Sequence, residues 1–423
     1  MNVADLNDVQ ALDTRAREIL RMNDRGGYTV PTDGLYPYQW NWDSMFAAWG
    51  FAGFDLDRAW AEVETLFTGQ WANGMVPHIL FHRPDPGYFP GPEVWDTEGP
   101  VPSSGITQPP VAACFVRALW ARDRARPEAE RLFDKLLAWH RWFMAWRSIE
   151  GVVFVVHPWE SGRDNAPDWD VAMAAIDPAG VQPYTRRDTS HVDASMRPTK
   201  ADYDRYIWLV ERGRRLGWDD AAMADNAPFR VADPGQTFIF LAACRDLAEM
   251  GRAMKRDTAE IDGWIATLEA GAATLWNDEI GGFDSRDFGS GQRSGALTNA
   301  SYLCWFAGID DERMAARFDA MMARVPYPIA SLDPEDARFD ARRYWRGPTW
   351  GMMNTLVGLG LARMGHRDRA HTLRKRTADL IARHGFAEYF DPMEGQPAGG
   401  GTFTWTAAIW LAWASPSARG GEA

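Results

Sequence analysis

The sequence predicts an all-α protein, a closed ring of helical hairpins with long loops gathered at one end. Apolar residues recur at helical spacing along nearly the whole chain. Only short runs, such as residues 152–156, have the composition of a strand. The predicted helices are paired and similar in length, and several are joined by long loops rich in aromatic and acidic residues, where function usually resides.

The segment 5–22 illustrates the helical pattern, because Leu12, Ala16 and Ile19 fall on one face of a helix. Local signals mark some ends: Asp233 places a capping acceptor before Pro234, and Gly385 suits the position after a helix. The predicted helices span residues 5–22, 56–69, 108–123, 128–147, 202–216, 234–254, 258–276, 294–306, 311–323, 350–364, 368–384 and 403–414.

The length of the chain, 423 residues, exceeds the usual size of one compact domain, so one large toroidal domain or two domains are both possible. No Ser/Gly linker, low-complexity tract or strong internal repeat divides the chain. We therefore expect a single domain over residues 1–423. Nothing in the sequence indicates an oligomeric state.

The charge balance excludes several classes of partner. The chain has 58 acidic and 45 basic residues, a formal net charge of −13, which disfavours nucleic acid and anionic membranes. No apolar run approaches the roughly 18 residues that span a bilayer. The N-terminus lacks the pattern of a signal peptide. The three cysteines are too few and too scattered for a disulfide framework. We expect a cytoplasmic protein.

Aromatic residues dominate the long loops. The chain has 22 tryptophans, and many lie beside Gly, Pro and Asp, where simple core packing explains them less well. Flat indole faces stack on the C–H faces of sugar rings as they do on other apolar surfaces. Loops of this composition at one end of a helical ring favour a sugar-binding pocket. They cover residues 31–43, 73–109, 157–170, 178–204, 325–349 and 386–402.

Two loop carboxyl groups match the chemistry of such a pocket. Hydrolysis of a glycosidic bond needs one protonated and one ionised carboxyl group on opposite sides of the bond. Aromatic, partly dry surroundings can raise a carboxyl pKa enough to keep the acid protonated. Asp164 and Glu388 are the candidates, with Glu160 as the alternative acid and Asp391 as the alternative base. The alternative is a structural role, in which Asp164 caps a helix and Glu388 lies in the turn after a helix.

Five motifs, spread from Tyr36 to Trp405, give the chain a family resemblance. They read QWNWDSMF, SGITQPP, WESGRDN, RYWRGPTWGMMN and EYFDP. In this order and spacing they resemble glycoside hydrolase family 63, most closely its small bacterial branch of mannosylglycerate and glucosylglycerate hydrolases. The resemblance implies an (α/α)6 barrel and hydrolysis of an α-glycoside with inversion of configuration, without a cofactor.

The resemblance also implies roles for the two carboxyl groups. The Asp of the WESGRDN motif, Asp164, is then the general acid, and the Glu of EYFDP, Glu388, is the general base. Position 163 departs from the family, because Arg163 stands where an apolar residue is expected. A guanidinium aimed at Asp164 would lower its pKa and impair an acid. We therefore expect Arg163 to point away.

The sugar subsite follows from the same resemblance. Asp43 is similar to the residue that accepts hydrogen bonds from sugar hydroxyls, a strong contact for a carboxylate. Core packing is the alternative for its aromatic neighbours. The other residues expected to line this subsite are Tyr36, Trp40, Trp42, Gln108, Gly162, Trp345 and Trp405.

A second set of residues corresponds to the leaving-group subsite. Tyr88, Arg197 and Tyr203 stand where the family holds glycerate, and Tyr344 joins them. An arginine flanked by phenols is a suitable receptor for one carboxylate. The implied substrates are mannosylglycerate and glucosylglycerate, both small molecules. If Arg197 instead makes a surface ion pair, a neutral disaccharide such as kojibiose or trehalose is the better substrate.

Other chemistries have little support. His78 and His82 have the spacing of zinc ligands on a helix, but Pro77 precedes them and no third ligand is evident, so we expect no metal. No dinucleotide fingerprint, phosphate-binding loop or serine-hydrolase elbow occurs, and we expect no cofactor. A sugar epimerase, which would need basic histidines, and a non-catalytic sugar-binding protein are the remaining alternatives.

Overall fold

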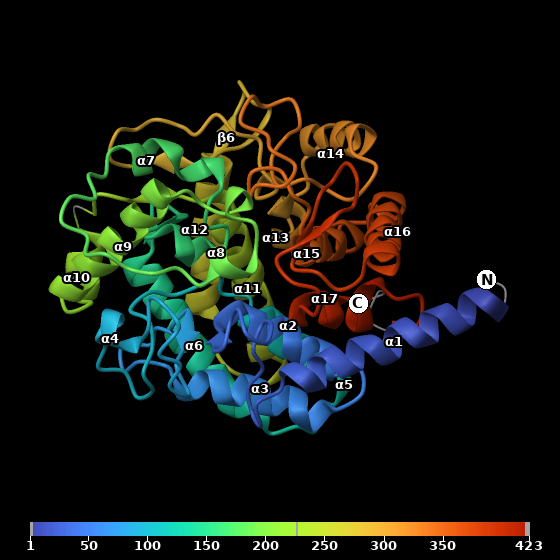
Figure 1. Ribbon diagram of the computed structural model, residues 1–423. Helices are drawn as coiled ribbons and strands as arrows, with labels where there is room; N and C mark the ends of the chain where they lie inside the picture. The colour runs from blue at the N-terminus through green and yellow to red at the C-terminus, as the bar shows by residue number, and fades with distance from the viewer. Residues whose placement is uncertain (1–2, 226, 419–423) are drawn as a thin grey trace.

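Six helices form an inner ring in the computed structural model, which describes residues 3–225 and 227–418. Each packs against the next, and α17 returns to α2, so the ring is closed (Figure 1). The inner helices are α2 (Asn41–Phe51), α5 (Ala112–Arg122), α11 (Pro234–Ala253), α13 (Cys304–Ala307), α15 (Gly351–Arg363) and α17 (Thr404–Ile409).

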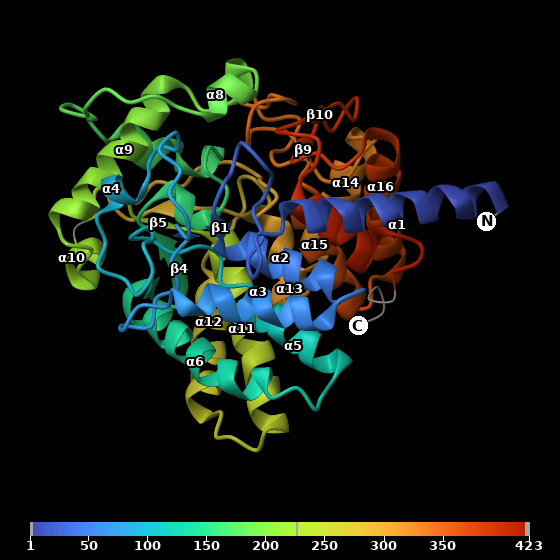
Figure 2. The ribbon, with the colours of Figure 1, turned by 60° about the horizontal axis from the view of Figure 1, so that its bottom comes forward.

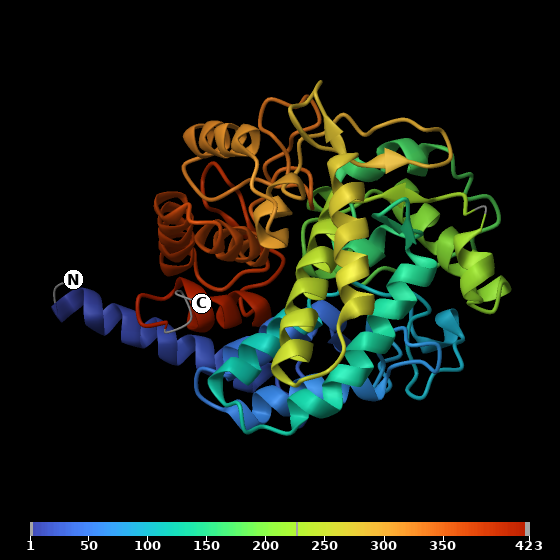
Figure 3. The ribbon, with the colours of Figure 1, turned by 180° about the vertical axis from the view of Figure 1, so that it is seen from behind.

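An outer helix accompanies each inner one. Figure 3 shows α11 and α12 side by side as a long hairpin. The first and last helices of the barrel, α1 and α17, pack together and close the ring. Among the described residues this makes an (α/α)6 barrel, as expected from the sequence. The outer helices are α1 (Val3–Asn23), α3 (Leu56–Thr68), α6 (Glu128–Trp146), α12 (Ala259–Ala273), α14 (Glu312–Arg324) and α16 (Arg367–His384).

Burial explains why the two rings differ in sequence. Every residue of α2 is buried, so this helix has no polar stripe. The outer helix α3 buries one face, with Trp60, Val63 and Leu66 directed at the barrel. No helix of the described residues is both long and apolar enough to cross a bilayer.

Small sheets stabilise the loops. The largest has the antiparallel order β3-β4-β5-β8, and β4 confirms the predicted strand at residues 152–156. The strands are β1 (Gln39–Trp40), β2 (Ile79–Leu80), β3 (Ser148–Ile149), β4 (Val152–Val155), β5 (Val231–Ala232), β6 (Trp276–Asn277), β7 (Gly282–Phe283), β8 (Arg286–Asp287), β9 (Tyr389–Phe390) and β10 (Pro397–Ala398).

Short helices and turns complete the loops. Figure 2 shows α8 and the β9–β10 hairpin at the same end of the molecule. The additional helices are α4 (Pro92–Trp95), α7 (Asp170–Ala174), α8 (Asp188–His191), α9 (Lys200–Arg215) and α10 (Asp220–Ala224). The 3-10 turns are Pro158–Ser161, Pro167–Trp169, Ala194–Met196 and Ser301–Leu303, and Trp410–Ala414 is a π-helical turn.

Most predicted helices are confirmed within a few residues, and two predictions need correction. The helix expected over 294–306 is largely a loop, since Thr298 bridges to Leu332 and only the Ser301–Leu303 turn and α13 are helical. The helix expected from residue 108 begins at Ala112, because two prolines precede it. The helix α2 was not predicted.

Candidate active site

A pocket with about 950 Å³ of empty space, part of it open to solvent, lies where the long loops converge. Its walls come from segments far apart in the chain, including the first turns of α2 and α17 and the loops before α9 and β9. The predicted site residues that line it are Tyr36, Trp40, Trp42, Asp43, Tyr88, Gln108, Gly162, Asp164, Arg197, Tyr203, Tyr344, Glu388 and Trp405.

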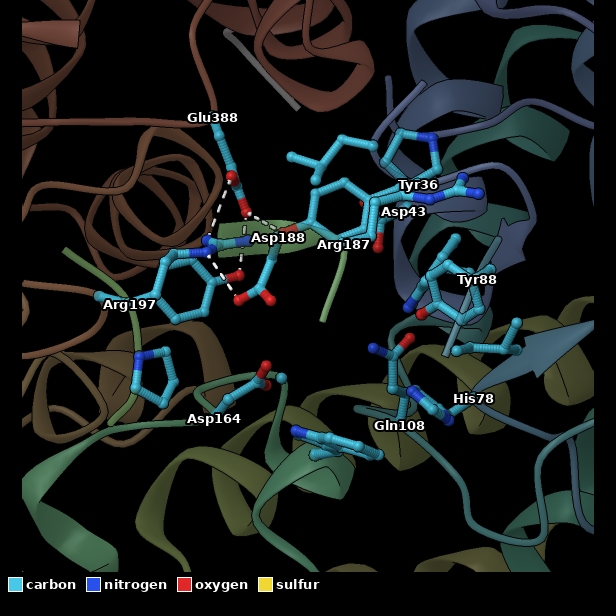
Figure 4. A pocket seen from close by; sticks show the side chains of 18 of the residues that line it. Tyr36, Asp43, His78, Tyr88, Gln108, Asp164, Arg187, Asp188, Arg197 and Glu388 are labelled. Atoms are coloured by element: carbon cyan, nitrogen blue, oxygen red, sulfur yellow. Dashed lines mark hydrogen bonds and ion pairs between the residues drawn. The ribbon is translucent and has the colours of Figure 1, made fainter. Parts of the chain in front are cut away.

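Asp164 and Glu388 both line this pocket and lie across it from each other (Figure 4). Asp164 follows a 3-10 turn that ends at Gly162, whose φ of +67° favours glycine. A Cβ at Gly162 would approach the ring of Trp42 to 2.5 Å. Glycine therefore allows the Asp164 loop and the aromatic wall to approach closely.

Three anchors hold the Asp164 loop. Tyr206 donates a hydrogen bond from its hydroxyl to the backbone oxygen of Asp164, at 2.8 Å. Asn165 donates from its side chain to the backbone oxygen of Tyr344, at 3.2 Å. The side chain of Arg163 turns into the protein and pairs with Asp168 at 2.9 Å and Asp233 at 2.7 Å. The prediction that Arg163 points away from Asp164 is confirmed.

The carboxyl group of Asp164 lies in a dry environment. Burial raises its pKa to about 7, an effect that the charge of Arg197 opposes and that of Glu388 reinforces. Among the described residues, no side chain donates a hydrogen bond to this carboxyl group. Such a group holds a proton near neutral pH, which suits a general acid.

Glu388 is more buried than Asp164 and is surrounded by donors. Burial raises its pKa to about 7, while Arg197, Tyr344 and Tyr36 oppose this shift. The hydroxyls of Tyr344 and Tyr36 donate to its Oε1 at 2.9 and 3.2 Å. The Nη1 of Arg197 lies 3.7 Å from its Oε2. All three groups stabilise the ionised form, which suits a general base.

Arg197 lies inside the pocket wall and not at the surface. Its side chain is 3% exposed, it donates to the hydroxyl of Tyr36, and its Nε donates to Asp188 at 3.3 Å. Its guanidinium lies over the ring of Tyr344, 4.3 Å from the ring centre. The alternative of a surface ion pair is therefore wrong.

The first turn of α2 presents Asp43 and Trp42 to the pocket. Burial and the charge of Glu388 raise the pKa of Asp43 well above its usual value. The side-chain oxygen of Gln108 accepts a hydrogen bond from the backbone nitrogen of Trp42, at 3.2 Å. This leaves the amide nitrogen of Gln108 available to a ligand.

Trp345 is the exception among the predicted site residues. It does not belong to the pocket wall; its ring stacks parallel to that of Trp350, with centroids 3.7 Å apart and planes at 4°. It is fully buried behind Tyr344. Core packing takes up its ring in this structure, and the contact of Trp345 with the substrate stays a prediction.

The alternative carboxyl groups have structural roles. Glu160 accepts hydrogen bonds from the guanidinium of Arg147 and lies outside the pocket wall. Asp391 accepts from the backbone nitrogens of Met393 and Glu394 and stabilises a turn. Neither is placed for catalysis.

The structure adds residues that the sequence interpretation did not select. Those lining the pocket include His78, Trp159, Arg187, Asp188, Tyr206 and Phe403. Trp159 belongs to the WESGRDN motif, and Arg187 and Asp188 belong to the polar loop at 178–204, so the motif and the loop were available as signals.

The two histidines with zinc-like spacing serve different networks. The Nδ1 of His78 contacts the hydroxyl of Ser104 at 2.8 Å, and the Nε2 of His82 contacts the side-chain oxygen of Gln39 at 2.7 Å. Within residues 3–225 and 227–418, no group of three or more His, Cys, Asp or Glu could hold a metal ion.

Known proteins resemble this chain over most of its length. A mannosylglycerate hydrolase of Selaginella moellendorffii, MGH1, is 46% identical over 417 residues, 96% of this chain and 85% of that protein. A glucosylglycerate hydrolase of Mycolicibacterium hassiacum is 36% identical, over 95% of this chain and 97% of that protein.

A solved structure has the same fold. The family 63 mannosylglycerate hydrolase of Thermus thermophilus, in complex with Tris and D-glycerate, superposes with a TM-score of 0.91. It is 42% identical, over 94% of this chain and 98% of that one. The sequence profile of the mannosylglycerate hydrolase MGH1-like glycoside hydrolase domain matches residues 36–406. The chain therefore belongs to this family of glycoside hydrolases.

Proposed function

We propose that this glycoside hydrolase cleaves mannosylglycerate or glucosylglycerate into the sugar and glycerate, with inversion at the anomeric carbon. Asp164 is the general acid and Glu388 the general base of the proposal. The observation that carries it is the pair of carboxyl groups on one pocket, only one of which receives hydrogen bonds from phenols.

In the proposed reaction, the carboxyl group of Asp164 protonates the glycosidic oxygen as the bond to the anomeric carbon breaks. The carboxylate of Glu388 takes a proton from a water molecule, whose oxygen attacks the anomeric carbon from the opposite side. The phenols of Tyr36 and Tyr344 hold Glu388 in position and favour its charge before the water arrives.

The 186–197 segment supports an anionic leaving group. Its three arginines each lie over a different phenol ring, with guanidinium-to-centroid distances of 4.2, 6.0 and 4.3 Å. These pairs are Arg186 with Tyr203, Arg187 with Tyr88, and Arg197 with Tyr344. Arg187 and Arg197 line the pocket together with Tyr88, Tyr203 and Tyr344, and these two cations favour a small carboxylate such as glycerate.

The alternative substrates and functions would each give a different set of products. A neutral α-disaccharide would use the same catalytic pair but gain nothing from the arginines of the 186–197 segment. An epimerase would release an isomerised, unhydrolysed sugar, and a binding protein would leave the sugar intact. The names and the glycerate-bound structure of the relatives favour the glycerate-bearing substrates.

The direct experiment compares hydrolysis of mannosylglycerate, glucosylglycerate, kojibiose and trehalose by the purified chain. The proposal expects release of glycerate from one or both glycerosides, with kcat/KM well above that for either disaccharide. Proton NMR of the first product should show the inverted anomer. A higher kcat/KM for a disaccharide would contradict the proposed glycerate-bearing substrate. A product with retained configuration would contradict the single-step mechanism.

We also propose a domain organisation and a cellular location for the enzyme. The proposal takes residues 1–423 as one catalytic domain, which the packing of α1 against α17 favours. It also takes the cytoplasm as the site of action, favoured by cysteines 114, 244 and 304, all buried and free.

A further inference from the structure

His78 lies at a fixed position beside the proposed sugar subsite. Its backbone oxygen accepts a hydrogen bond from the backbone nitrogen of Asn41, at 3.0 Å. The next backbone nitrogen, that of Trp42, donates to the side chain of Gln108. His78 and Gln108 thus satisfy the first two N–H groups of α2, the helix whose first turn presents Asp43. This arrangement fixes His78 relative to Asp43 through the backbone.

The side chain of His78 is held by one ring nitrogen only. Its Nδ1 lies 2.8 Å from the hydroxyl of Ser104, and that hydroxyl also accepts from the backbone nitrogen of Ile79 at 3.1 Å. The Nε2 has no hydrogen-bond partner among the described residues, and His78 lines the pocket. Figure 4 shows His78 and Gln108 on the wall away from Glu388.

The contact with Ser104 is compatible with both neutral tautomers of His78, and the two differ in which atom donates. The serine has one proton, and its possible acceptors are the Nδ1 of His78 at 2.8 Å and the backbone oxygen of Ile106 at 3.4 Å. When the serine proton points at Nδ1, the ring accepts there; when it points at the backbone oxygen of Ile106, the Nδ1–H of His78 donates to the serine oxygen. A neutral ring that accepts at Nδ1 has its proton on Nε2.

We propose that His78 is a specificity-determining residue whose Nε2–H donates a hydrogen bond to a hydroxyl oxygen of the sugar bound beside Asp43 and Gln108. The inference rests on the proposed function in that a sugar occupies this end of the pocket. The subsite then holds a neutral donor as well as the acceptor Asp43, so that it recognises hydroxyls as donors and as acceptors.

The surroundings keep His78 neutral and oriented. Burial and the neighbouring His157 hold the pKa of His78 well below its usual value, so the ring has one proton at neutral pH. The ring of Trp159 lies nearly parallel to it, with centroids 6.1 Å apart and planes at 24°. His157 is not available to a sugar, because its nitrogens contact the backbone of Tyr206 and Trp159.

Two substitutions distinguish the contribution of the Nε2 of His78 from that of its Nδ1. In His78→Gln the terminal amide reaches about as far as Nε2, whereas in His78→Asn it reaches only the position of Nδ1. We expect His78→Asn to lower kcat/KM about 10- to 100-fold, since a buried partner loses its hydrogen bond. His78→Gln should retain most of the activity, and His371→Asn, on the exposed side of α16, should match the wild type.

Sugar binding gives a readout that does not depend on catalysis. Calorimetry would compare mannose or glucose with its monodeoxy derivatives, on the wild type and on both variants, each with its folding checked by thermal unfolding. We expect one deoxy derivative to bind the wild type at least about 10-fold more weakly. This ratio should approach one in His78→Asn and persist in His78→Gln.

The outcomes distinguish this inference from the proposed function. A wild-type protein that binds neither sugar contradicts both. If it binds sugar but His78→Asn keeps every deoxy ratio, only the His78 assignment is wrong. Should His78→Asn not fold, 15N NMR of the wild-type histidines decides: a proton on Nε2 supports the inference, and a proton on Nδ1 overturns it.

Discussion

The surroundings of Asp164 and Glu388 differ although burial raises both pKa values to about 7. Asp164 receives no hydrogen bond from any described side chain. Glu388 receives two from Tyr36 and Tyr344 and has the Nη1 of Arg197 at 3.7 Å. Burial alone therefore does not decide which group donates the proton.

The difference assigns the roles. Two carboxyl groups that face one pocket resist double ionisation, so near neutral pH the pair holds about one proton. The phenols and the guanidinium stabilise charge on Glu388, and the proton therefore resides on Asp164. The activity should then fall on both sides of about pH 7, as Glu388 is protonated at lower pH and Asp164 ionises at higher pH.

Removing either group should have the largest effect. Asp164→Asn and Glu388→Gln should each lower kcat on the natural substrate by about 10³-fold or more, because each removes a proton transfer. Steady-state kinetics measures the loss, and circular dichroism and thermal unfolding check that the fold is intact. Near-normal turnover in either variant would contradict the catalytic role of the residue that was replaced.

Arg197 should have the next largest effect, because it lies beside Glu388 and belongs to the proposed anion subsite. Arg197→Ala should lower kcat/KM on a glycerate glycoside by about 100-fold, and by less on a neutral disaccharide. Kinetics on both substrates measures the difference. Equal losses would mean that Arg197 supports Glu388 alone and is no receptor for the carboxylate.

Tyr344→Phe should change the pH dependence of kcat/KM by altering the surroundings of Glu388. The hydroxyl of Tyr344 stabilises ionised Glu388, so its loss raises the pKa of Glu388. The acidic limb of kcat/KM should move to higher pH, by up to about one unit, or about 1.4 kcal/mol. The alkaline limb, which reports Asp164, should move less. A shift of the acidic limb to lower pH would contradict the contact.

The smallest effect on activity should come from the neighbour of Tyr344. Trp345 packs on Trp350 behind the pocket wall, so Trp345→Phe should leave KM within about two-fold. It should reduce stability by about 1–3 kcal/mol, because it removes part of a buried ring. Chemical denaturation and substrate kinetics measure the two quantities. A large rise in KM would show that Trp345 contacts the substrate.

Periodicity predicted the amphipathic helices of the outer ring well, because each has one polar face. It missed α2, whose residues are all buried and which therefore lacks the polar stripe that marks a helix. It placed a helix over 294–306, where long-range contacts such as Asn299 with Ser331 override the local pattern. Tertiary contacts of this kind are not visible in a local window of sequence.

The catalytic candidates followed from motifs, and the pocket brings them together. The sequence could not separate Tyr344 from Trp345, which are adjacent aromatics with opposite placements, one on the pocket wall and one behind it. His78 was considered only as a metal ligand, because its place beside α2 depends on a pairing between distant loops. Chemistry that a motif contains was predictable, and the direction of a side chain was not.

The most direct test of the assignment uses a substrate that needs no acid. Fluoride leaves an α-glycosyl fluoride without full protonation, so Asp164→Asn should hydrolyse this substrate at a rate approaching that of the wild type. Glu388→Gln should remain inactive, because the attacking water still lacks its base. Recovery of Glu388→Gln but not of Asp164→Asn would exchange the two roles and contradict the account.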